Sequence, residues 1–382
     1  MRVGRRWFHQ YAPVETPARL ADWLDGLSGR PVAAPDGTPS PPDAWIEEAV
    51  SRITPPEAWW RAVPHDTDLA VQEDFELRHV ASADAHGSGT EHMTGGSRRR
   101  CTVVHHADRE YVGKSRHYQS GLEAFEESAA MELAAGARAQ AVTITAAEPV
   151  SLRTTPVVFA PSVGAAFFHE LVGHAAEADN LASPDGYLAR RFGRRVADSG
   201  LTVMDDPALE DGFGAMAVDD EGAPAQLVRL IDRGVVSGSL NSLRTRGGSP
   251  RNGHGRRASF RAPALPRATN LVIGPGSADS ADLTAPGQGE LLLIAALGAG
   301  GVHPHSGEFM FSAPEAYLIT AQGRRPLRDV HLTGMAADAL ARLTAIGADS
   351  ATDSAVCLKH GQAIGVGFSS PSIRFDDLTW WS

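Results

Sequence analysis

From about residue 180 onward, the sequence alternates between short apolar runs and glycine-rich connections. The connections include GAGGVHPHSGE and RTRGGSPRNGHGRR, and the apolar runs are LTVMDD, AQLVRLID, ELLLIAAL, AYLITAQ, IGVGF and SIRF. Apolar runs of about four to eight residues between turn residues are typical of β-strands. Only AADALARLTAIG indicates a helix in this half. We therefore expect a C-terminal region dominated by a curved antiparallel β-sheet.

The first half of the chain has a mixed pattern. LADWLDGL and PDAWIEEAVSRI have the apolar spacing of amphipathic helices, and FELRHVASA, RRRCTVVHHA and EYVGKSRHY indicate short strands. HGSGTEHMTGGS between the first two strands indicates a turn. GLEAFEESAAMELAAGARAQA predicts one long helix, whose apolar face consists of Leu122, Phe125, Ala129, Leu133 and Ala137.

A chain of 382 residues is long enough for two domains. We place the boundary in ITAAEPVSLRTTP, near residue 150. The expected architecture is α+β, with a smaller N-terminal α/β domain over residues 1–150 and a C-terminal domain over residues 151–382.

Charge and composition exclude several classes of protein. A net charge of −11 without a dense basic stripe argues against binding to nucleic acid or to an anionic membrane. No run approaches the ~20 apolar residues of a membrane span, and MRVGRRWFHQYAPVETP lacks the apolar core of a secretory signal. The only cysteines, Cys101 and Cys357, cannot form a disulfide scaffold, which fits a reducing cytoplasm. We interpret Cys101 as an ordinary strand residue.

The segment FFHELVGHAAEAD, residues 167–179, has two histidines that could bind a metal ion. It follows the strand PVVFAP, and Ser162 is expected to cap a helix over residues 163–177. His169 and His174 are five residues apart, which puts them roughly 140° apart on a regular α-helix. A π-bulge would bring them together, and Gly173 has the backbone freedom to allow one. A shared metal site therefore requires a distorted helix.

Acidic residues surround the two histidines. Glu170 could act as a general base toward a metal-bound water, as in zinc peptidases, without being a ligand. Glu177 and Asp179 lie one turn further on and could orient a ligand histidine. The alternative is an ordinary amphipathic helix with two histidines that bind nothing.

A catalytic zinc usually has three protein ligands. The candidates for the third are carboxylates, other histidines and Cys357. His303 and His305, in GVHPHSGEF, are possible ligands but are more simply explained as residues of a polar loop. A lone cysteine such as Cys357 is more often a small buried apolar residue.

The order of motifs over about residues 150–380 resembles that of the TldD/PmbA family of metallopeptidases. HELVGHAAEAD resembles the family helix, except that Ala178 replaces the usual glycine. Four further segments resemble family segments in the same order: VMDDPALEDGFGAMAVDDEGAPAQLVRLIDRGVV, RNGHGRRASFRAPALPRATNLVIGPG, GEFMFSAPEAYLI and CLKHGQAIGVGFSSPSIRFDDLTW. Family members usually have a longer N-terminal domain, so this one is expected to be shortened or divergent.

The resemblance implies a site and a way of assembling. Zn²⁺, one ion per active subunit, would be held by His169, His174 and Cys357, with Glu170 as the general base. The intact motif places the chain in the metal-bearing, TldD-like branch. The family forms dimers, so a partner is expected, which is either a PmbA-like subunit without the motif or a second copy of this chain.

Three residues of the glycine-rich segment NGHGRRASF are candidates for substrate binding. His254, Arg256 and Arg257 could contact a peptide backbone or a terminal carboxylate, because arginine suits carboxylates. The alternative is a turn with solvated cations.

Three functions remain open. The first is a metallopeptidase that cleaves unstructured peptides, which could bind by strand addition. The second is an amide hydrolase or tailoring enzyme for a small natural product. The third is a non-catalytic partner subunit, which the intact HExxxH motif and Cys357 argue against.

Overall fold

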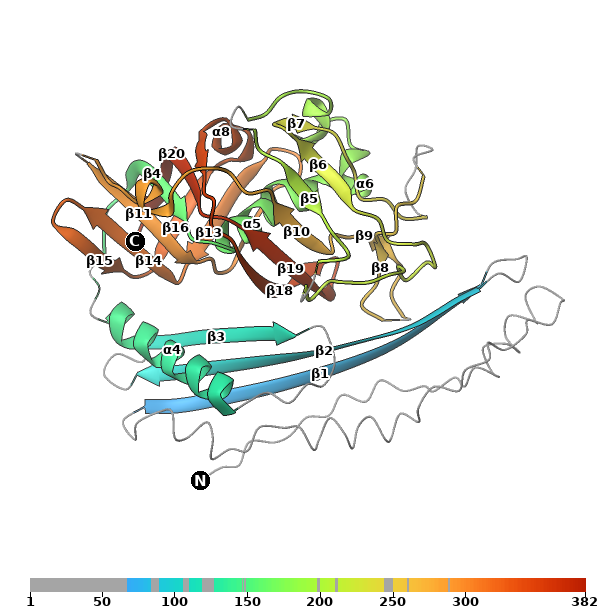
Figure 1. The fold of residues 1–382 in the computed structure, drawn as a ribbon, viewed down its shortest axis with the longest axis horizontal. Helices are drawn as coiled ribbons and strands as arrows, with labels where there is room; N and C mark the ends of the chain where they lie inside the picture. Colours follow the sequence, from blue (N-terminus) through green and yellow to red (C-terminus); the bar gives the residue numbers. More distant parts are fainter. Residues whose placement is uncertain are drawn as a thin grey trace.

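The computed structural model describes residues 67–83, 89–105, 110–118, 127–145, 147, 149–197, 200–209, 212–243, 250–259, 261–287 and 289–382. The two helices expected in LADWLDGL and PDAWIEEAVSRI lie outside these residues. The described part combines helices with sheets, and a curved, mostly antiparallel sheet dominates its C-terminal region (Figure 1). The expected α+β architecture is therefore confirmed.

The largest sheet has nine strands. Its order is β12 (Gly300–Val302), β13 (Glu308–Ala313), β16 (Val330–Met335), β20 (Ile373–Trp381), β4 (Arg153–Phe159), β11 (Glu290–Ala296), β14 (Glu315–Thr320) and β15 (Gly323–Leu327), with β17 (Leu343–Ile346) also paired to β20. All its pairs are antiparallel except that of β4 with β11.

A second sheet of six strands carries part of the candidate site. Its order is β18 (Ala351–Lys359), β19 (Gln362–Ser370), β10 (Asn270–Ile273), β5 (Val203–Asp205), β6 (Val228–Asp232) and β7 (Val235–Val236). Only β10 and β19 run parallel. A separate pair is formed by β8 (Gly255–Arg256) and β9 (Leu265–Pro266).

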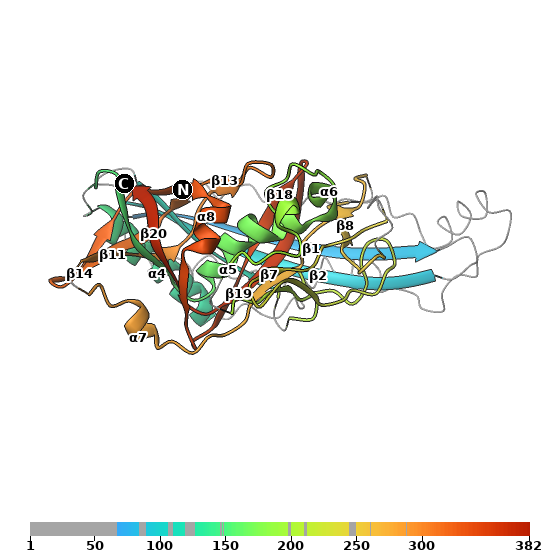
Figure 2. The ribbon, with the colours of Figure 1, turned by 90° about the horizontal axis from the view of Figure 1, so that it is seen from above.

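Helix α5 (Val163–Phe168) lies between these two sheets, near the middle of the molecule in Figure 2. Phe167 projects from it into a cluster of rings from β4, β13 and β20. The ring centroids of its partners lie 4.6 to 5.8 Å away, on Phe159, Phe309, Phe311 and Phe375. The alternation of buried and exposed residues along β13 directs its phenylalanines to this core. The cluster fixes the helix two residues before His169.

The remaining helices after residue 180 are short: α7 (Ser280–Leu283), α8 (Ala336–Ala341) and a single 3₁₀ turn over Ala189–Arg191. The prediction of a helix over AADALARLTAIG is correct only for its first half, which forms α8. Its second part forms β17, because Leu343 and Ile346 pair with β20 at the edge of the core.

The N-terminal region contains a three-stranded antiparallel sheet, formed by β1 (Thr67–Ala83), β2 (Gly89–His105) and β3 (Glu110–Tyr118). Helix α4 (Glu127–Thr145) packs on this sheet, as Figure 1 shows. Cys101 lies within β2, as expected. The turn predicted in HGSGTEHMTGGS was wrong for most of its length, because Gly89 and the residues after it continue the pairing with β1.

Helix α4 buries a slightly different face from the expected one. Ala134, Ala137, Ala141 and Ile144 are buried, whereas Leu133 is half-buried. Leu122 and Phe125 lie outside the described residues. Among the described residues, no helix is both long and apolar enough to cross a membrane.

Candidate metal centre

The histidine helix is distorted where both histidines attach. After α5, residues His169–Gly173 form a π-helical turn, and His174–Ala176 form a 3₁₀ turn (here η1 and η2). The backbone N–H of His174 donates to the carbonyl of His169, a bond across five residues. The ring centroids of the two histidines are therefore only 4.7 Å apart. The distortion that the five-residue spacing requires is present.

Gly173 serves this turn for a different reason from the expected one. Its φ of −54° is an ordinary helical value, so no special backbone freedom is used. A Cβ atom at this position would lie 3.3 Å from Cδ1 of Leu271 and 3.5 Å from Nδ1 of His169. The tighter of these contacts is with Leu271, so glycine lets the π-turn lie close to β10 of the six-stranded sheet.

The start of α5 is capped from another strand. Ser162 precedes the helix with φ +69°, and its hydroxyl makes no capping hydrogen bond. The Oγ of Ser370, at the end of β19, accepts instead from the N–H of Ala165 at 3.1 Å. The expectation that Ser162 caps the helix was wrong, because its left-handed backbone directs the hydroxyl elsewhere.

Cys357 joins the two histidines from strand β18. Its Sγ lies 3.1 Å from Nε2 of His174. One donor atom from each of His169, His174 and Cys357 lies within 4.8 Å of the other two. Cys357 is 7% exposed and His169 is 2% exposed. The structure thus brings together the three residues that the sequence singled out.

The chemistry of these donors fits a metal ion. Both ring nitrogens of His169 are buried and have no hydrogen-bond partner among the described residues, which is rare for a polar group unless something else binds it. Burial raises the pKa of the Cys357 thiol, but His169 and His174 outweigh burial and lower it to about 4. A thiolate beside imidazoles is a donor set that zinc prefers.

Glu177 orients His174. Its carboxylate is fully buried, and Oε2 lies 3.0 Å from Nδ1 of His174. Burial raises the pKa of Glu177, but His174 and Lys359 outweigh it and lower the pKa to about 2. Burial lowers the pKa of His174, whereas Glu177 and Cys357 hold it well above its ordinary value. A carboxylate on Nδ1 leaves Nε2 directed at Cys357.

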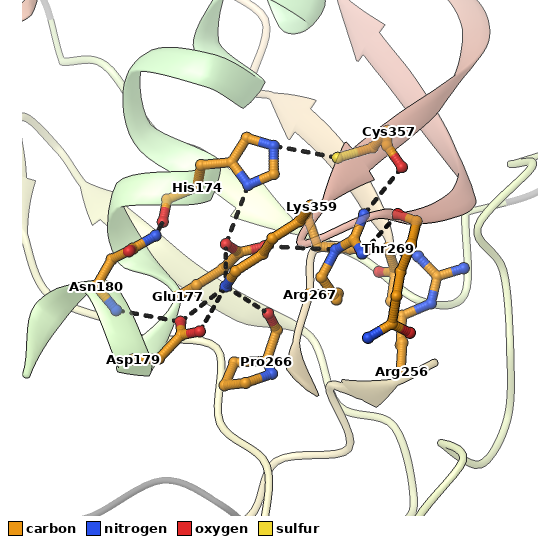
Figure 3. A network of polar contacts seen from close by, with 12 residues as sticks. His174, Glu177, Asp179, Asn180, Arg256, Pro266, Arg267, Thr269, Cys357 and Lys359 are labelled. Carbon is orange, nitrogen blue, oxygen red and sulfur yellow. Dashed lines mark hydrogen bonds and ion pairs between the residues drawn. The ribbon is translucent and has the colours of Figure 1, made fainter. Parts of the chain in front are cut away.

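Asp179, the other acidic residue expected to orient a histidine, is instead paired with Lys359 at 2.7 Å. Lys359 also lies 2.8 Å from Glu177, and Arg267 contacts the same carboxylate at 3.9 Å (Figure 3). Sequence reasoning missed both cations. The two-residue spacing of Lys359 from Cys357 was the available signal, because it puts both side chains on one face of a strand.

Glu170 lies at the edge of the site. Its Oε1 is 3.8 Å from Nε2 of His174, and its side chain is 28% exposed. A Cβ atom on Gly301, in β12, would lie 3.7 Å from Oε2 of Glu170. The carboxylate thus reaches both solvent and the metal-ligand cluster, as a general base requires.

The expected substrate residues His254 and Arg256 are directed into the protein. Nε2 of His254 lies 2.9 Å from the buried Asp205, and its Nδ1 lies 3.0 Å from the carbonyl of Asn252. Arg256 is also buried and donates to the carbonyls of Ala268 and Gly365. Through these contacts, His254 and Arg256 attach their segment to strands β5 and β19 of the six-stranded sheet. The expected role of these two side chains in substrate binding therefore has no support in this structure.

The last three candidates lie at or near the surface. Arg257 is half-buried, and its backbone N–H donates to Asp220 at 2.7 Å. His303 and His305 are exposed, and each ring contacts a serine, Ser306 and Ser183 respectively. The two rings lie 5.8 Å apart, outside the group of three ligand candidates. They belong to the polar loop that the sequence suggested.

Comparison with known proteins connects this geometry to a family. Residues 152–381 match the family model described as the PmbA/TldA metallopeptidase C-terminal domain. The chain belongs to the TldD/PmbA family of metallopeptidases. Its match to that model includes the histidine helix and strand β18.

Two relatives illustrate the similarity. A protein named metalloprotease from Methanothermobacter thermautotrophicus is 32% identical over 257 residues, which is 66% of this chain and 56% of that protein. A protein named zinc metalloprotease TldD homolog from Saccharolobus solfataricus is 29% identical, over 58% of this chain and 50% of the relative. The chain thus spans about half the length of these TldD/PmbA relatives.

Among solved structures, TldE from Thermococcus kodakarensis has a similar fold. The TM-score is 0.65, and the match covers 90% of this chain and 77% of that one at 19% sequence identity. At this identity the similarity shows that the two proteins share a fold.

Proposed function

We propose that this chain is a zinc-dependent hydrolase of the TldD type, which cleaves amide bonds in unstructured peptides. The observation that carries the proposal is the convergence of His169, His174 and Cys357, with Glu170 beside them. Family membership supports a metallopeptidase, and a relative's name mentions zinc.

Each residue of the centre has a proposed role. His169, His174 and Cys357 would hold the ion, which when bound supplies a Lewis acid toward a carbonyl oxygen. Glu170 takes a proton from water and returns it to the leaving nitrogen, for which its partial exposure and its place beside His174 suit it. Glu177 accepts a hydrogen bond from Nδ1 of His174, so that Nε2 of the same ring stays unprotonated and can bind the metal ion.

The position of Cys357 also supports an extended substrate. Strand β18 is at one end of the six-stranded sheet, so among the described strands it is paired on one side only. Val356 and Leu358, on either side of Cys357, are 38% and 71% exposed. Strand β3 of the N-terminal sheet lies close to β18, so a peptide that pairs with β18 would run alongside β3 and past the centre.

We also propose how the protein is organised and where it acts. The domain boundary falls near residue 150, just before the part that matches the family model. The subunit pairs either with a TldE-like subunit, a possibility supported by the shared fold, or with itself. It acts in the cytoplasm, where a reducing environment keeps the Cys357 thiol available.

Metal analysis and a peptide assay test the proposal. Purified protein should contain about one zinc per site-bearing chain. It should cleave members of a mixed pool of unfolded peptides, alone or after addition of a TldE-like subunit. Absence of bound metal would contradict a hydrolase and favour a non-catalytic subunit. A zinc-loaded protein that is inert on every peptide, with and without the partner, would favour an amide substrate of small-molecule type.

A further inference from the structure

We propose that Lys359 and Arg267 are positioning residues that hold the metal ligands His174 and Cys357 together through the buried carboxylate of Glu177. This inference rests on the proposed function, since it concerns the same centre. It assigns a role to two cations that were not singled out from the sequence and that contact Glu177.

Lys359 ties the ligand strand to the ligand helix. Its Nζ lies 2.8 Å from Oε2 of Glu177 and 2.7 Å from Oδ2 of Asp179, and it donates to the carbonyl of Pro266 at 3.3 Å. Its side chain is 9% exposed. Lys359 and Cys357 are alternate residues of β18, so both point toward the helix (Figure 3). The ion pairs therefore fix the strand opposite His174.

Arg267 makes the complementary connection. Its Nη2 donates to the carbonyl of Cys357 at 3.0 Å, and its Nη1 donates to the carbonyl of Gln362 at 3.2 Å. Its Nε lies 3.9 Å from Oε1 of Glu177. The side chain is 1% exposed. One planar guanidinium thus touches the backbone of one ligand and the carboxylate that orients another.

Burial explains why the two cations are needed. Glu177 is fully buried, and a buried carboxylate without compensating charge is strongly destabilising. Oε2 contacts both His174 and Lys359, whereas Oε1 has no hydrogen-bond partner in the described structure and faces Arg267. Without Lys359, the carboxylate would lose its shortest ion pair and would turn toward Arg267, away from Nδ1 of His174. The cations therefore define the direction in which Nε2 points.

The test compares Lys359→Met with a matched control, Arg153→Met. Arg153 forms an ion pair of the same length, 2.8 Å, with Glu290, but on the exposed side of the nine-stranded sheet. Zinc affinity is measured by competition with a chelator. We expect Lys359→Met to raise the dissociation constant on the order of tenfold or more, the usual effect of losing a partner behind a ligand, and Arg153→Met to leave it unchanged.

Cobalt provides a readout that loss of stability alone would not change. In the cobalt-loaded protein, the thiolate-to-metal absorption band reports the geometry at Cys357, and this band should shift in Lys359→Met. If that variant does not fold, the double variant Lys359→Met, Glu177→Gln removes the buried charge with its partner. It should fold and still bind zinc on the order of tenfold more weakly.

Two results would overturn the inference. One is a folded Lys359→Met protein with wild-type zinc affinity and an unchanged cobalt spectrum. The other is a folded double variant with wild-type affinity. Failure of the proposed function looks different, because it appears in the wild-type protein, which would then either bind neither zinc nor cobalt or bind zinc and cleave no peptide.

Discussion

The Sγ atom of Cys357 lies 3.1 Å from Nε2 of His174, although 183 residues separate the two along the chain. This contact connects the last hairpin of the six-stranded sheet to the helix between the two sheets. Because a thiolate is a much better zinc ligand than a hydroxyl, Cys357→Ser should reduce zinc content at least tenfold. Metal analysis of the dialysed protein measures this loss.

The fold of the serine variant has to be checked in parallel. Its circular dichroism and its metal-free thermal unfolding should match those of the metal-free wild type. A variant that retains full zinc content would show that Cys357 is not a ligand.

Removal of Glu170 should separate catalysis from metal binding. Its carboxylate is partly exposed and lies 3.8 Å from Nε2 of His174. Glu170 is not one of the three residues that could hold the metal ion. We expect Glu170→Gln to lower the turnover number roughly 10²- to 10⁴-fold, the range for loss of a general base, with unchanged zinc content. Glu290→Gln, on the nine-stranded sheet, is the control for a change of charge. Retained turnover at normal zinc content would rule out Glu170 as the base.

Glu177 should make the metal-free protein sensitive to acid. Its pKa is lowered from 4.5 to about 2, so its contribution to stability is present above pH 4.5 and is lost as the pH falls toward 2. The contribution is on the order of 3 kcal/mol. The difference in unfolding free energy between wild type and Glu177→Gln should therefore shrink between pH 6 and pH 3. Denaturant unfolding at each pH measures it, and a constant difference would contradict the prediction.

Ser370, rather than Ser162, should stabilise the start of the histidine helix. Ser370→Ala removes one of the two acceptors of the Ala165 N–H, the other being the carbonyl of Ser162, and should lower the free energy of unfolding by roughly 0.5–1 kcal/mol. Ser162→Gly should be neutral or stabilising, because glycine adopts a φ of +69° without strain. Urea denaturation of both variants compares them. Equal destabilisation by the two changes would argue against this assignment of the cap.

The two histidines could be predicted as ligand candidates from the sequence because their chemistry depends on residue type and spacing. Cys357 followed only from the resemblance to the family, since a lone cysteine is more often a buried apolar residue. The five-residue interval between His169 and His174 required a π-turn, and the structure contains it. The cations around Glu177 could not be predicted in the same way. Arg267 reaches the centre from the loop after β9, a position set only by tertiary packing.

The incorrect expectations about the fold also arise from tertiary contacts that local sequence does not show. The segment HGSGTEHMTGGS has the composition of a turn, yet most of it pairs with β1, and a long partner strand overrides local propensity. Residues 343–346 continue a helical pattern but form β17, because their apolar side chains pack better beside β20. For Gly173, the sequence could not show that the reason for glycine is the close approach of Leu271 on β10.

The place of Cys357 in the chain has a consequence for biosynthesis. During translation, the ribosome adds Cys357, in strand β18, 183 residues after His174 of the histidine helix. A nascent chain that has not yet reached Cys357 lacks one of the three metal-ligand candidates. It also lacks Lys359, which forms an ion pair with Glu177. Such a polypeptide would lack the proposed metal centre, and with it the activity proposed above. The proposed metal centre could thus form only after translation has passed Cys357 and Lys359.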